Sequence, residues 1–223
     1  MGTYGEMRKN GVLLRGDRGS FRYLWAWLGS MGIFLLCEKF IDESICHSVY
    51  IPLDDLVPFS EVFVLFYVLW YFLILGSLIW FAAYSARGFE RFLKYMTVCQ
   101  LIAVVIFIAF PNKQELRPEV MPRENVFSFL TSVIHSVDTN TNVCPSLHVC
   151  YSFAMLSVWM REGKSRITKV VYLLLALLIS ASTVFIKQHS VLDILAALPV
   201  CLVAEILTNL DFLENKVYKN EDL

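Results

Sequence analysis

The chain has 223 residues, of which 57% are hydrophobic and only 17% are charged. A soluble domain carries about 25% charged residues, so this composition excludes an ordinary soluble protein and indicates an integral membrane protein. The net charge of -1 carries no signal for nucleic acid, and we expect no nucleic-acid partner.

Six apolar runs with almost no Lys, Arg, Asp or Glu follow one another along the chain; the single charged residue among them is Glu205 in the sixth. They are residues 23–37, 62–86, 95–112, 143–160, 170–186 and 194–210. A helix that crosses a bilayer needs about 20 residues, and the runs lack the alternation of membrane strands. The first run reaches the length of a span only with flanking residues, and the fourth and sixth runs begin at a polar edge. We predict an all-α membrane protein, a six-transmembrane-helix bundle over 23–210 with tails at 1–22 and 211–223.

The basic residues predict the orientation of this bundle, because Lys and Arg collect in cytoplasmic loops. With a cytoplasmic N-terminus, the outer segments hold only five of the 19 basic residues, Lys39, Lys113, Arg117, Arg123 and Lys187. Both termini are therefore predicted to be cytoplasmic. The polar edges that carry His148 and His189 then fall on the extracytoplasmic face.

Two outer segments have a pattern of their own. In the longer one, 111–144, apolar residues recur at helical spacing between Val126 and Val137. This helix either lies in the membrane interface or packs on the bundle. The shorter one, 50–59, holds two prolines and two acids, and forms either a rim that guides a lipid head group or a structural cap over helix ends.

His189 and Asp193 are four residues apart at the start of the sixth run. On a helix they share a face, and the carboxylate fixes the imidazole tautomer so that the other ring nitrogen acts as a base or nucleophile. A pair that only caps the helix is the alternative. His148 follows Pro145 and Ser146, which suit a helix start, so it lies beside an anion site and in position to donate a proton.

Three outer cations accompany the histidines. Arg117 offers a planar fork for phosphate oxygens, and Lys187 and Lys113 offer point charges. Together with a nucleophile and a proton donor, they describe phosphoryl transfer. Zinc ligation by Cys144, His148 and His189 has no further thiolate or carboxylate cluster to support it, so we expect no metal and no cofactor.

These segments resemble the three signature motifs of the type 2 phosphatidic acid phosphatase (PAP2) superfamily. The motifs are Arg117-Pro118, Pro145-Ser146-Leu147-His148 and Ser182…His189…Asp193. The resemblance implies that His189 forms a phosphohistidine, that Asp193 orients it, and that His148 protonates the leaving group and then activates water. It also implies that Arg117 and Ser146 bind the phosphate.

The motifs depart from the family pattern at three positions. Phe110 stands where the first motif has a lysine, Leu147 replaces a glycine, and Thr183 replaces an arginine for which Lys187 is a candidate substitute. These changes resemble the branch that contains inositol phosphorylceramide synthases and related bacterial proteins.

We therefore expect a metal-independent lipid phosphatase that acts on a lipid phosphate or pyrophosphate in the bilayer. The alternatives are a head-group phosphotransferase and an inactive or non-enzymatic lipid-binding membrane protein. Cys46 and Cys144 both fall in outer segments, where they form either a disulfide or two separate thiols.

Overall fold

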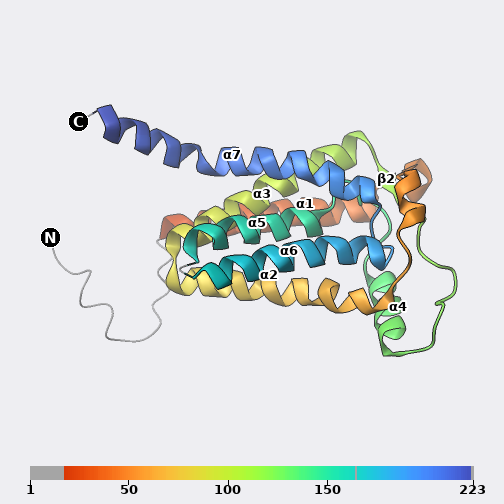
Figure 1. Ribbon diagram of the computed structural model, residues 1–223. Coiled ribbons are helices and arrows are strands. Elements are labelled where there is room, and N and C mark those ends of the chain that lie inside the picture. Colours follow the sequence, from red (N-terminus) through yellow and green to blue (C-terminus); the bar gives the residue numbers. More distant parts are fainter. Residues whose placement is uncertain (1–17, 164, 222–223) are drawn as a thin grey trace.

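The computed structural model describes residues 18–163 and 165–221, with side chains from 21 to 209 apart from 164. The described part is mostly helical (Figure 1). Its α-helices are α1 (Arg18–Phe40), α2 (Val64–Tyr84), α3 (Ala86–Ala109), α4 (Val126–Val137), α5 (Leu147–Glu162), α6 (Arg166–Phe185) and α7 (Val191–Glu221). The predicted tail 1–22 lies almost wholly outside the described residues, whereas 211–221 continue α7.

Four helical segments of the described chain are long and apolar enough to cross a membrane. They are Glu61–Tyr84, Ala86–Ala109, Arg166–Phe185 and Val191–Asn209. The helix α5 has 16 residues, fewer than the roughly 20 that a span needs, and α1 carries charges near both ends. The prediction of a helical membrane protein is supported, and the count of six spans stays a prediction.

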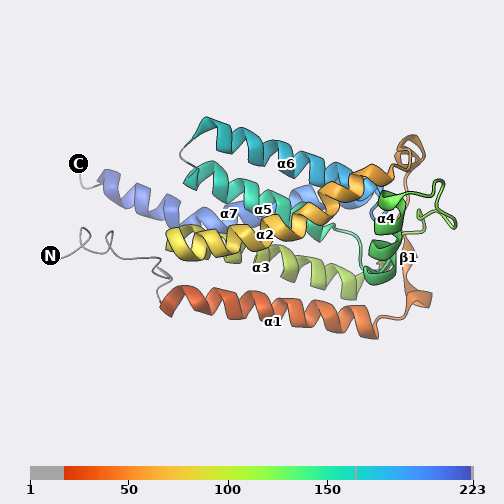
Figure 2. The ribbon, with the colours of Figure 1, turned by 90° about the horizontal axis from the view of Figure 1, so that it is seen from below.

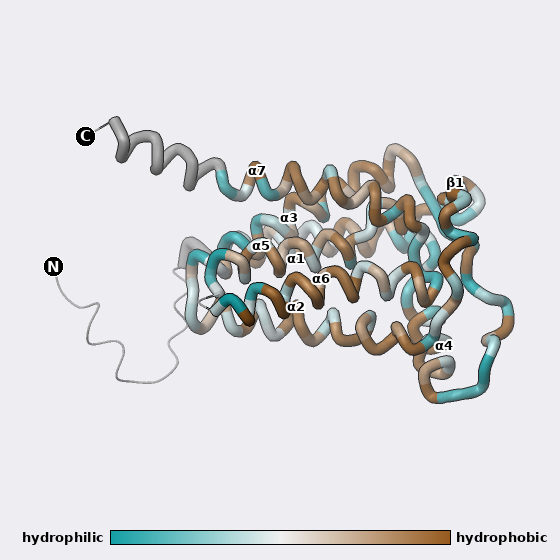
Figure 3. The backbone as a smooth tube through the Cα atoms, viewed as in Figure 1, coloured by the Kyte–Doolittle hydropathy of each residue, from teal (hydrophilic) through white to brown (hydrophobic). Residues whose placement is uncertain are grey.

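The long helices form one bundle with a buried core. α3 packs against α1, α5 and α7, and α5 also packs against α6. The fully buried side chains include Phe92, Met96, Met155 and Ile179, which come from three of these helices. Figure 3 shows apolar residues along the middle of the helices and polar residues at their ends, as expected for a bundle surrounded by lipid.

All the long connections gather at one end of the bundle, which we call the loop end (Figures 1 and 2). It holds α4, the short 3-10 helices η2 (Glu43–Ile45), η3 (Pro52–Leu56) and η4 (Glu61–Phe63), and two strands. The strands β1 (His47–Ser48) and β2 (Asn112–Lys113) pair in parallel. The opposite end has tight turns; at one of them only Ser85 separates α2 from α3, and its side chain accepts a hydrogen bond from Gly88.

The helix α4 packs on the bundle with part of its apolar pattern, one of the two alternatives that its sequence left open. Leu130 and Ile134 pack with Val64 and Ile186 on the ends of the bundle helices. The rest of the apolar pattern faces outward, with Phe129 68% and Val137 78% exposed. A helix that buries one apolar side and exposes another suits a position between the bundle and the lipid interface.

Candidate active site

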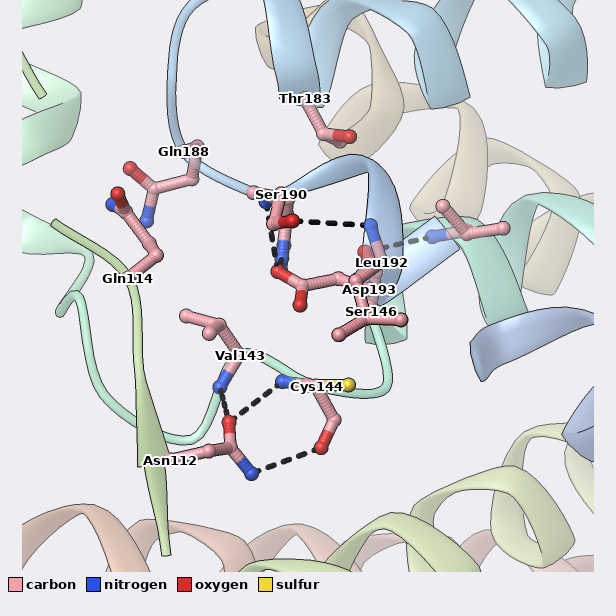
Figure 4. A network of polar contacts seen from close by, with 12 residues as sticks. Asn112, Gln114, Val143, Cys144, Ser146, Thr183, Gln188, Ser190, Leu192 and Asp193 are labelled. Atoms are coloured by element: carbon pink, nitrogen blue, oxygen red, sulfur yellow. Dashed lines mark hydrogen bonds and ion pairs between the residues drawn. The ribbon is translucent and has the colours of Figure 1, made fainter. Parts of the chain in front are cut away.

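The turn between α6 and α7 places His189 against Asp193. The ring nitrogen Nδ1 of His189 lies 2.9 Å from Oδ2 of Asp193, and both side chains are buried. The same oxygen accepts a hydrogen bond from the backbone N–H of Ser190 at 3.0 Å (Figure 4). The carboxylate therefore caps the start of α7 and also orients the imidazole, which combines the two roles expected from the sequence.

The segment 50–59 caps this turn from outside. The buried carboxylate of Asp54 in η3 accepts hydrogen bonds from the hydroxyl of Ser190 and the amide of Val191. The ammonium of Lys187 donates to the carbonyls of Asp54 at 2.9 Å and Val57 at 2.6 Å. These contacts confirm the capping alternative for this segment. They also hold the backbone in place on both sides of His189.

The helix α5 brings His148 to the same place. Ser146 is its N-cap, with a side chain that accepts from the amide of Val149 at 3.4 Å, as the sequence predicts. The ring of His148 packs on the rings of Tyr67 and Trp70 of α2, with centroids 4.4 and 4.2 Å away. Its centroid is 5.7 Å from that of His189. A histidine on α5 and a histidine in the α6–α7 turn therefore face each other across one small space.

A pocket of about 170 Å³ opens beside the two rings, and both histidines line it. Its lining also includes Glu38, Asp138 and Gln188, together with Trp70 and Gln100. The Nε2 atom of His148 is buried and has no hydrogen-bond partner. The arrangement offers an oriented imidazole, a second imidazole with an unused nitrogen, and space for a reacting group between them.

Arg117 does not line this pocket itself, but it contacts Gln188, which does. Its guanidinium donates to the carbonyls of His135, Asp138 and Thr139, and at 2.8 Å to Oε1 of Gln188. Burial lowers its pKa, yet an arginine stays charged at neutral pH. Gln188 thus connects the predicted phosphate ligand to the lining of the pocket.

The other predicted phosphate ligands are placed elsewhere. The ammonium of Lys113 forms ion pairs with Glu43 at 3.5 Å and Glu115 at 3.0 Å. The ammonium of Lys187 is bound to the carbonyls of Asp54 and Val57, and burial lowers its pKa. Ser146 is fully buried behind the pocket, with its amide donating to the carbonyl of Asp193. The structure brings together His189, Asp193 and His148, with Arg117 adjacent, but does not bring the two lysines to the pocket.

The profile of the PAP2 superfamily matches residues 52–207, which is more than half of the chain and includes every motif discussed above. The chain belongs to the PAP2 superfamily. No curated protein and no solved structure shows significant similarity to it. Membership in the PAP2 superfamily supports a phosphatase-type or phosphotransferase-type activity on a lipid phosphate.

Several residues that support this PAP2 site were not predicted from the sequence. The side chain of Asn112 accepts from the amides of Val143 and Cys144 and donates to the carbonyl of Cys144, which fixes the approach to α5 (Figure 4). Asp54 and Gln188 act similarly on the α6–α7 turn. Gln188 lies beside His189 in the sequence, a usable signal, whereas nothing near Asp54 or Asn112 points to residues so far along the chain.

The two outer cysteines and the possible zinc ligands are the remaining candidates from the sequence. Cys46 and Cys144 are both free thiols, so the predicted disulfide alternative does not hold here. Burial raises the pKa of the Cys144 thiol to about 12, because the site is desolvated and Asp193 is near. Among residues 18–163 and 165–221, no three His, Cys, Asp or Glu side chains are grouped to hold a metal ion.

Proposed function

We propose that the chain hydrolyses a lipid phosphate monoester or pyrophosphate through a phosphohistidine on His189. The observation that carries the proposal is the oriented His189–Asp193 pair, 2.9 Å between Nδ1 and Oδ2, facing His148 across the pocket. Asp193 holds the Nδ1 proton, which leaves Nε2 with a lone pair for attack. In this proposal the lipid bilayer supplies the substrate, and the distribution of basic residues favours the extracytoplasmic face for the reaction.

The proposed reaction has two steps. In the first, Nε2 of His189 bonds to phosphorus while the bond from phosphorus to the lipid oxygen breaks, and protonated His148 gives its proton to that oxygen. In the second, water attacks the phosphohistidine, His148 takes a proton from the water, and the nitrogen–phosphorus bond breaks to release phosphate. We assign Arg117 to the phosphate oxygens, because it is the predicted cation adjacent to the pocket.

Transfer to an alcohol in place of water is the second candidate. The observation that favours it is Thr183, which is fully buried and spends its hydroxyl on the carbonyl of Ser180 where the superfamily motif has an arginine. This departure is one of the three that together resemble the inositol phosphorylceramide synthase branch. An alcohol would use the same nucleophile and the same base, so only the product separates the two reactions.

The test is a substrate panel with the purified protein. Phosphatidate, phosphatidylglycerol phosphate and polyprenyl pyrophosphate are supplied separately, with and without candidate alcohols, and both released phosphate and new phospholipid are measured. We expect release from at least one lipid and none from His189→Ala. The matched control is His47→Ala, a histidine on β1 that stacks on Phe110, which should keep wild-type turnover. Unchanged turnover in His189→Ala would exclude the nucleophile, and no product with any lipid would favour a non-enzymatic protein.

A further inference from the structure

A chain of hydrogen bonds crosses three helices beside the pocket. The indole Nε1 of Trp27 in α1 donates to the hydroxyl of Tyr151 in α5 at 2.9 Å. That hydroxyl in turn donates to Oε1 of Gln100 in α3. An indole N–H is a donor only, so the tyrosine oxygen accepts and its single proton must go to the glutamine oxygen. The direction of these two hydrogen bonds therefore fixes the orientation of the Gln100 carboxamide.

This orientation leaves the amide nitrogen of Gln100 without an acceptor. The residue is 0% exposed, and its Nε2 has no hydrogen-bond partner. Leaving a buried donor unpaired costs about 1–3 kcal/mol, which an apolar residue at the same place would avoid. Gln100 nevertheless lines the pocket together with His148 and His189. The indole Nε1 of Trp70, in the same lining, is a second buried donor without a partner.

The position of Gln100 fits a particular part of a lipid. Its partner Tyr151 follows His148 by three residues on α5, and both line the pocket together with Gln100. In an acylated phospholipid, the acyl carbonyls follow the phosphate by a few bonds toward the hydrocarbon. The neighbouring pocket wall is apolar, with Met31 and Phe34 of α1. The pocket lining thus offers two histidines for a phosphate, the Gln100 amide for a carbonyl and apolar side chains for an acyl chain.

We propose that Gln100 binds an acyl carbonyl of the substrate, and that the substrate is an acylated lipid phosphate instead of a polyprenyl one. The inference rests on the proposed function. A polyprenyl pyrophosphate has no oxygen beyond its phosphates, so it would leave the Gln100 amide unpaired. Two sources carry the required carbonyl: the ester of a glycerolipid and the amide of a ceramide-type lipid.

The test compares lipids that differ only in the carbonyl. The ratio of kcat/KM for diacyl phosphatidate over its dialkyl ether analogue is measured for the wild type and for Gln100→Met, and ceramide 1-phosphate forms a third arm that identifies the source. Because both lipids meet the same preparation, the ratio is independent of the folded fraction. We expect about a three- to tenfold preference for the diacyl lipid in the wild type, the value of one neutral hydrogen bond, and a ratio near one in Gln100→Met.

Thr208→Val serves as the matched control. It removes a buried hydroxyl that bonds only within α7 far from the pocket, and it should keep the wild-type ratio. The inference would be overturned if the wild type preferred neither the diacyl lipid nor ceramide 1-phosphate over the dialkyl lipid. An unchanged diacyl-to-dialkyl ratio in Gln100→Met would also overturn it. If no lipid is turned over, the proposed function fails separately. The inference is then tested by binding. The shift in melting temperature that each lipid causes is measured for His189→Ala and for the double variant that also carries Gln100→Met.

Discussion

At the scale of single residues, the site depends on side chains that make more than one contact. Asp193 bonds the ring of His189 and the amide of Ser190 with the same carboxylate oxygen. Arg117 is bound by three carbonyls and by Gln188. His135 is half-buried; this desolvation, and then the charge of Arg117, lower its pKa to about 4, and its ring bonds the carbonyl of Ile186. Such shared contacts hold the imidazole of His189 in a single orientation.

The change Asp193→Asn tests the orienting role. The amide keeps the size of the side chain but loses the anion that holds the proton on Nδ1 of His189, so the lone pair on Nε2 is no longer fixed. We expect kcat to fall on the order of 10²–10⁴-fold with a much smaller change in KM. Steady-state kinetics with the best lipid of the panel measure this. Asp42→Asn, at the exposed cap of η2, is the control; a kcat within twofold of wild type for Asp193→Asn would contradict the orienting role.

Lys187 and Lys113 provide a second comparison, because both were predicted to bind phosphate and only one stabilises the site. Lys187→Met removes two charged hydrogen bonds to the η3 carbonyls, and we expect the free energy of unfolding to fall by about 1–3 kcal/mol together with kcat. Lys113→Met removes ion pairs with two exposed glutamates, which solvent screens, and should leave both the free energy of unfolding and kcat nearly unchanged. Thermal melting in detergent and turnover measure both; a raised KM with unchanged stability in Lys187→Met would restore its role as a phosphate ligand.

At the scale of elements, the start of α7 is held by a segment that is more than a hundred residues earlier in the chain. The short helix η3 places Asp54 against the first amides of α7, and the long connection 111–144 places Asn112 against the approach to α5. The start of α7, just after His189, and the approach to α5, which carries His148, are therefore each held by a side chain from another part of the loop end. Asp54 and Asn112 thus position both histidine-bearing segments although neither side chain is a reacting group.

Asp54 and its neighbour Asp55 test this element directly. Asp54 is 2% exposed and bonds Ser190 and Val191, whereas Asp55 bonds only the exposed hydroxyl of Tyr50. Asp54→Ala should lower the free energy of unfolding by about 1–3 kcal/mol, because it leaves buried donors unpaired, and should also reduce kcat. Asp55→Ala should change neither by a measurable amount. Equal melting temperatures for the two variants would show that η3 does not hold α7.

At the scale of the whole molecule, the sequence predicts the helices better than their ends. The third apolar run begins at residue 95, but α3 begins at Ala86, because its first turns carry charges at the polar end of the bundle. The pair His189–Asp193 follows from helical spacing alone, and Ser146 as a cap follows from its place before α5. The positions of Lys187, Asp54 and Gln100 depend on contacts between distant segments, which spacing along one element cannot supply.

The orientation of the bundle is the remaining whole-molecule prediction, since the count of basic residues puts the loop end outside the cell. Cysteines introduced at Glu119, exposed in the connection 111–144, and at Arg166, exposed at the start of α6, lie at opposite ends of the bundle. We expect a membrane-impermeant maleimide to label Glu119→Cys in intact cells and Arg166→Cys only after permeabilisation, each measured above the labelling of the parent protein. The reverse pattern would place the histidines on the cytoplasmic face. The same lipid phosphatase chemistry would then act on the inner leaflet, because the site faces whichever leaflet adjoins the loop end.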